Sequence, residues 1–160
     1  MQVQAQKEHE WLGQLVGEWT FETEAVMGPG QPPVVSTGSE SVRSIGGVWV
    51  QCEGAMEMPG GDPGTTVMTL GYDPAKGRFV GTFIGSMMTN LWVYDGQLDA
   101  AGKVLTLDAE GPSFADPAKT AKYKDTIEII SADHRTLSSQ FRADDGTWHK
   151  FMTAHYRRKK

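Results

Sequence analysis

Three charged side chains in strand-like segments are the residues whose types and spacing could do chemistry. By alternation, Arg43, Asp125 and Lys150 fall on faces whose other members are apolar. A charge in apolar surroundings is costly unless it is paired. One interpretation places these residues at strand ends, or has the register wrong by one. The other is a small charged anchor inside a cavity, able to hold a carboxylate or a similar head group.

Instead of anchoring a ligand, polar residues of the same interior could catalyse an acid–base reaction. Tyr156 or the Asp125 carboxylate could act as acid or base in an enzyme. The chain has no G-x-S-x-G elbow, phosphate-binding loop or G-x-G-x-x-G fingerprint. Cys52, the single cysteine, has no neighbouring cation that would activate it, so we interpret it as a small buried residue. The sequence therefore predicts no catalytic residue.

The chain has four histidines, which raises the question of a metal-binding site. His149 and His155 share a strand face by parity, but six residues at ~3.3 Å each separate them by ~20 Å. Two ligands of one zinc ion lie far closer than that. We therefore expect surface histidines and no metal.

The elements that must position these residues are mostly strands. A short helix is predicted at about residues 8–15, where Trp11, Leu12 and Leu15 have helical spacing. From about residue 18 to residue 158, period-two alternation recurs in about ten strands joined by short turns. Such a meander hides its edges best as a single closed antiparallel up-and-down β-barrel, an all-β fold occupying residues 1–160. A two-sheet sandwich is the competing architecture.

The interior of a ten-stranded barrel offers a binding cavity. An eight-stranded barrel is about filled by its own side chains, whereas more strands leave an interior space. Methionine adapts to varied apolar partners, and Gly81 and Gly85 would leave room for strand curvature or a ligand. The alternative is that the same side chains meet and fill the core. The predicted cavity lining comprises Trp19, Phe21, Arg43, Met56, Met68, Phe83, Trp92, Tyr94, Asp125, Lys150, Met152 and Tyr156.

Composition narrows the classes of partner. Hydrophobic residues at 39% and charged residues at 22% are typical of a folded globular domain. A net charge of -5 and a pI near 5.3 argue against nucleic acid and against an anionic membrane surface. The N-terminus does not resemble a signal peptide, and no apolar run approaches ~18 residues, so we expect a cytoplasmic protein.

Several stretches resemble a bacterial family. "LVGEWTFE", "TGSESVRSIGG", "LGYDPAKGRFVGTFIGS" and "DDGTWHKFMTAHYRRK", in this order, are similar to the family called domain of unknown function 1579. The resemblance implies a calycin-like β-barrel, related in shape to lipocalins and fatty-acid-binding proteins, with no established activity. Family members often have an acidic residue before the serine of "IGS", whereas this chain has Gly85. A role of that carboxylate therefore does not transfer.

The calycin-like resemblance also raises the question of haem. Some such barrels hold haem through one histidine near the last strand, and His155 is at about that place. However, Met152, Ala154 and Tyr156 alternate as the apolar face, which turns His155 outward. We expect no haem and no other cofactor.

Three functional hypotheses follow. The first is a non-enzymatic barrel that binds a small apolar or amphipathic molecule in its interior. The second is an enzyme of unknown reaction acting in the same pocket. The third is a structural domain with a filled core, assembled as a homo-oligomer.

Overall fold

Alternation of apolar and polar residues builds the strands. In β1 (Gly17–Ala25), Trp19, Phe21 and Thr23 are buried, whereas the residues between them are exposed. Because successive strand residues point to opposite faces, one face of β1 lines the interior and the other meets solvent. The predicted period of two is confirmed in this strand.

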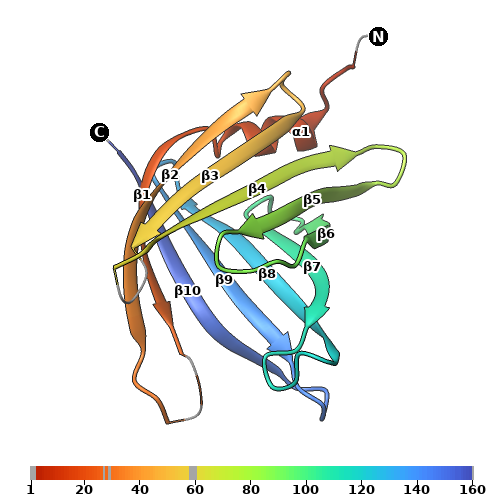
Figure 1. Cartoon of the computed structure of the whole chain (residues 1–160). Helices are drawn as coiled ribbons and strands as arrows, with labels where there is room; N and C mark the ends of the chain where they lie inside the picture. The colour runs from red at the N-terminus through yellow and green to blue at the C-terminus, as the bar shows by residue number, and fades with distance from the viewer. Residues whose placement is uncertain (1–2, 27, 29, 58–60, 160) are drawn as a thin grey trace.

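Ten antiparallel strands follow one another and close into a barrel. The structure is a computed structural model that describes residues 3–26, 28, 30–57 and 61–159. Consecutive strands pair, and β1 pairs with β10 to close the ring (Figure 1). The predicted closed up-and-down barrel with one short N-terminal helix is confirmed, and the sandwich is excluded. The other elements are α1 (Lys7–Gly13), β2 (Val34–Ile45), β3 (Trp49–Glu57), β4 (Pro63–Asp73), β5 (Arg78–Gly85), β6 (Trp92–Leu98), β7 (Val104–Pro112), β8 (Thr120–Ser131), β9 (His134–Arg142) and β10 (Trp148–Arg158).

Helix α1 covers one end of the barrel, here called the closed end. Leu12 and Leu15 are at most 1% exposed and join the main hydrophobic cluster. The Trp11 indole Nε1 donates a hydrogen bond to the Gly102 carbonyl oxygen at 2.6 Å, which ties α1 to the β6–β7 connection. At seven residues α1 is too short to cross a bilayer, and no other helix of the described ranges is long and apolar enough to do so.

The barrel wall is continuous near the closed end and divides away from it. Among the described residues, strands β2 and β3 pair from Ile45↔Trp49 as far as Gly38↔Met56; β2 continues to Val34, whereas the described part of β3 ends at Glu57. Strands β6 and β7 pair from Leu98↔Leu105 only as far as Asp95↔Asp108. We call these two interruptions the β2–β3 seam and the β6–β7 seam.

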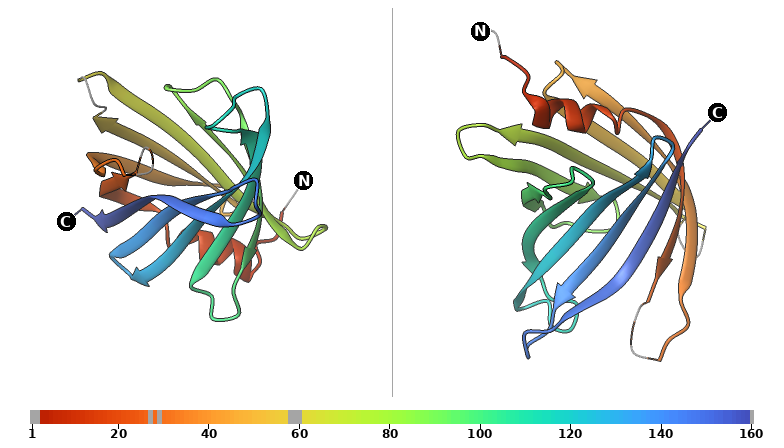
Figure 2. Two further views of the ribbon diagram at one scale, coloured as in Figure 1. Left: turned by 90° about the horizontal axis from the view of Figure 1, so that it is seen from below. Right: turned by 180° about the vertical axis from the view of Figure 1, so that it is seen from behind.

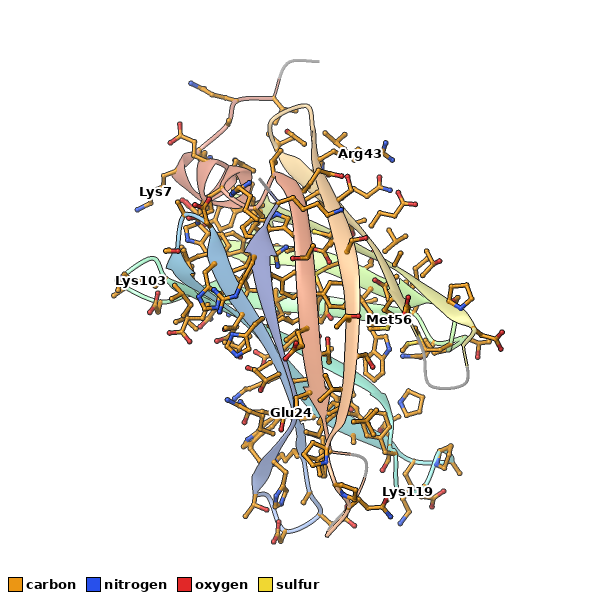
Figure 3. All side chains as sticks on the ribbon, turned by 90° about the vertical axis from the view of Figure 1, so that its left-hand side faces the viewer. Lys7, Glu24, Arg43, Met56, Lys103 and Lys119 are labelled. Atoms are coloured by element: carbon orange, nitrogen blue, oxygen red, sulfur yellow. The ribbon has the colours of Figure 1, made fainter. Side chains whose placement is uncertain are left out.

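The seams divide the far half of the barrel into two leaves. The small leaf contains β3–β6, and the large leaf contains β7–β10 with β1 and β2. In Figure 1 the large leaf runs on towards the bottom while the small leaf turns aside, and the left panel of Figure 2 views this end from below. We call it the open end. Lys7, Arg43 and Lys103 lie towards the closed end, and Glu24 and Lys119 towards the open end (Figure 3).

Candidate ligand site at the open end of the barrel

Ten of the twelve residues predicted to line a cavity lie on inward strand faces. The structure buries Trp19, Phe21, Met68, Tyr94 and Tyr156, and it leaves Met56, Phe83, Trp92, Asp125 and Met152 half-buried. The five half-buried side chains face inward and are not fully covered by the protein.

The inward placement of Arg43 was wrong. Val42 and Cys52 are buried and directly opposite each other across β2 and β3. Arg43 is the next residue along β2, so it faces outward, and it is exposed (Figure 3). The register was off by one, which transfers every side chain of a strand to the other face.

The inward placement of Lys150 was wrong for a different reason. Lys150 pairs with Gln140, whereas Met152 pairs with Ser139, so Phe151 is an extra residue in β10. A bulge of this kind breaks the period of two. Met152 therefore faces inward, as alternation predicts, while Lys150 is exposed.

Asp125 is the predicted charged residue that does face inward. Its neighbours in β7 and β9, Leu107 and Ser139, are both buried. Ser139 Oγ donates a hydrogen bond to Asp125 Oδ1 at 2.6 Å, and the Tyr94 hydroxyl donates a short one to Oδ2. Because Tyr94 belongs to β6 and Asp125 to β8, the second bond crosses the interior and joins the two leaves.

A second charged group, which the sequence reasoning missed, lies deeper in the barrel. Arg135 Nη2 and Glu40 Oε1 are 2.6 Å apart, and the two side chains are only 4% and 10% exposed. The Arg135 guanidinium lies 4.6 Å from the Trp19 ring and 4.1 Å from the Tyr156 ring. Its Nε is buried without a hydrogen-bond partner among the described residues. Alternation in β9 could have predicted that Arg135 faces inward, since Arg135 lies on the same strand face as Ser139.

Burial shifts the ionisation of the polar interior. It raises the pKa of Asp125, and the hydrogen bonds from Ser139 and Tyr94 oppose the shift. Burial is also the main cause that raises the pKa of Tyr94 and of Tyr156, so both phenols stay protonated. The protonated Tyr94 phenol therefore donates its hydrogen bond to the Asp125 carboxylate.

The charges inside the barrel do not balance when Asp125 is ionised. The ion pairs of the described residues are Arg78–Asp95, Arg135–Glu40 and Arg158–Asp133, and none of them includes Asp125. Among the described residues, the guanidinium of Arg135 is already paired with Glu40, and Asp125 has no cationic partner of its own. A further anion would meet uncompensated negative charge there.

Aromatic rings that the sequence reasoning missed form a rim on the large leaf. Tyr123 lies on an inward face of β8, and its ring centroid is 4.8 Å from that of Trp92 in the small leaf. Phe114, in the β7–β8 connection, is 66% exposed yet lies 5.3 Å from both Tyr123 and Phe151. Phe151 is the bulged residue, which alternation cannot place.

The outside of the β2–β3 seam carries a hollow of about 820 Å³. Phe21 and Met56 reach it from the inner face, while His155 and Arg157 border it from β10. His155 is exposed, as alternation predicts, and its Nδ1 lies 3.1 Å from His134 Nε2. It therefore does not point into the interior. The described residues bring together no group of three or more side chains suited to a metal ion.

The profile of a sequence family covers almost the whole chain. The family described as protein of unknown function (DUF1579) matches residues 4–158. The chain belongs to the DUF1579 family. No curated protein sequence matches this DUF1579 chain.

Solved structures of the same shape share little sequence with this DUF1579 protein. Rv2717c from M. tuberculosis has 15% identity and a TM-score of 0.63, covering 98% of this chain and 100% of that chain. The S-type phycobiliprotein lyase CPES from Guillardia theta has 14% identity and a TM-score of 0.58, covering 99% of each chain. EF1p2_mFAP2b bound to DFHBI has 12% identity and a TM-score of 0.51, covering 94% and 98%. At these identities the likeness shows the fold alone.

Proposed function

We propose that this DUF1579 barrel binds a small amphipathic molecule at its open end, without catalysis. The observation that carries the proposal is the group of half-buried, inward-facing side chains there, with Phe83, Trp92 and Met152 as the apolar wall. Half-buried apolar side chains inside a barrel retain contact area that a ligand can cover. EF1p2_mFAP2b bound to DFHBI has a barrel of the same kind, which agrees with the proposal.

Two features support an amphipathic rather than a purely apolar ligand. The wall ends at Asp125, Ser139 and Tyr94, which form a polar floor beside the apolar side chains. Ligand pockets commonly combine an apolar lining with a few polar groups that fix orientation. A molecule with one polar end would satisfy both parts.

A titration with the neutral dye Nile red tests the proposal. We expect saturable fluorescence enhancement with one dye per chain, and Trp92→Ala should weaken dye binding about fivefold through lost ring contact. Trp49→Ala is the matched control, since Trp49 is 43% exposed on β3 near the closed end and should leave dye binding unchanged. Absence of saturable binding, or equal weakening by both variants, would contradict the proposal.

A further inference from the structure

We propose that the ligand is an amphipathic amine, whose protonated nitrogen binds the Asp125 carboxylate while its apolar part lies against Phe83, Trp92 and Met152. The inference rests on the proposed binding function and specifies the chemistry of the ligand. The interior then prefers a cationic ligand, whereas the sequence placed Arg43 and Lys150 inward and suggested an anionic, carboxylate ligand.

The first step is access to Asp125 from the open end. Strands β7 and β9 flank β8, and the neighbours of Asp125 in them, Leu107 and Ser139, are 0% and 7% exposed. Asp125 itself is half-buried although it points inward. Solvent therefore reaches part of this residue from the interior, which is the side from which a ligand would approach.

The second step concerns hydrogen-bonding capacity. An ionised carboxylate has about four acceptor positions. Ser139 uses one on Oδ1 and Tyr94 one on Oδ2, so the two hydroxyls fix the carboxylate and leave each oxygen able to accept again. An ammonium group, which only donates, complements this arrangement.

The third step is charge. Arg135 is held by Glu40 at 2.6 Å, so it supplies no free positive charge to Asp125. A protonated amine supplies the missing counter-charge, and its presence favours the ionised carboxylate against the effect of burial. A carboxylate ligand would instead add a third anion to this interior.

The test compares three eight-carbon competitors of Nile red: octylamine, octanol and octanoate, at neutral pH. On the wild-type protein we expect octylamine to displace the dye at about tenfold lower concentration than octanoate, with octanol between them. Octanoate competing as well as octylamine would overturn the amine proposal while leaving the binding function intact. Failure of the dye itself to bind would overturn the binding function.

Two matched variants assign the preference to one carboxylate. With each competitor measured against that variant's own Nile red affinity, Asp125→Asn should reduce the preference for octylamine over octanoate from about tenfold to about twofold, because the charged hydrogen bond is lost. Asp108→Asn removes the same charge from the exposed face of β7 and should keep the wild-type ratio. A preference that survives Asp125→Asn would overturn the proposal. The wild-type comparison decides the amine preference even where Asp125→Asn does not fold.

Discussion

At the scale of single residues, two inward-facing carboxylates of the barrel, Glu40 and Asp125, have different hydrogen-bond and ion-pair partners. Glu40 forms an ion pair with Arg135, which also lies against the rings of Trp19 and Tyr156. Asp125 has two hydroxyl donors and no ion-pair partner among the described residues, so burial makes its ionised form less favourable than it is in the unfolded chain. A site that lowers stability in the absence of ligand is typical of function rather than of packing.

The raised pKa of Asp125 predicts how stability depends on pH. The folded state holds the proton more tightly than the unfolded state, whose carboxyl titrates near 3.8. The stabilisation is therefore complete below that pH and is lost as pH rises through the folded-state pKa. Asp125→Asn should remove this loss, so its free energy of unfolding at neutral pH should equal or exceed that of the wild type.

Urea unfolding between about pH 4 and about pH 7 measures this difference. The groups around Asp125 that could titrate, Tyr94 and Tyr156, are phenols whose pKa is raised, so they stay neutral throughout this range. Asp108→Asn should follow the wild-type profile. If Asp125→Asn shows the same dependence on pH as the wild type, the explanation is wrong.

At the scale of elements, the β6–β7 seam is bridged by one side chain. The Trp92 ring lies against Tyr123 and over Gly111 of β7, at a level where the two strands no longer pair. A Cβ atom on Gly111 would overlap that ring. Glycine at position 111 is therefore explained by the close approach of an aromatic side chain from the other leaf.

A double-mutant cycle tests this contact. Gly111→Ala should cost ~1–3 kcal/mol in the wild type through overpacking, and clearly less in a Trp92→Ala background, where the three nearest atoms are removed. Gly13→Ala is a control without a neighbouring atom within 4 Å, and it should be neutral or slightly stabilising in both backgrounds. Denaturant melts of the four proteins give the coupling energy, and additive effects would contradict the proposed contact.

Alternation predicted the strands and most inward faces because it is a local property of each strand. It failed at Lys150, where the bulge at Phe151 shifts the register, and at Arg43, on a strand whose two faces are both largely polar. Arg135 and Glu40 obey alternation, but their pairing across the barrel depends on closure and could not be read from either strand. The enzyme hypothesis based on Tyr156 or Asp125, and the homo-oligomer, stay predictions.

At the scale of the whole molecule, the two ends of the barrel have different packing. Residues near α1 such as Leu15, Leu70 and Leu105 are fully buried, whereas Met56 and Met152 at the open end are half-buried. Neither the alternation of apolar and polar residues nor the composition predicts this difference in packing between the two ends. The difference arises where strand pairing stops at the two seams. The fully packed core therefore lies in the half of the fold near α1, and the proposed ligand site lies in the other half.

Matched truncations at the two ends should show this division. Leu105→Ala should lower the free energy of unfolding by ~2–5 kcal/mol, because it leaves a void in a filled core. Met152→Ala removes a similar volume from a wall that is already open, and should cost only ~1 kcal/mol. Denaturant melts measure both, and Nile red binding should weaken in Met152→Ala alone. Equal costs would mean that the open end is as fully packed as the closed end.

The seams also affect how readily a strand of another chain could pair with the barrel. A fully closed barrel has no strand edge to which a foreign chain can add, but a seam restores a length of free edge on each strand that flanks it. On β7 this free length ends at Gly111 and Pro112, includes the charged Glu110, and is partly covered by Trp92. Proline has no N–H to donate, and charge discourages a neighbouring strand. This free edge is thus a poor template for fibril growth.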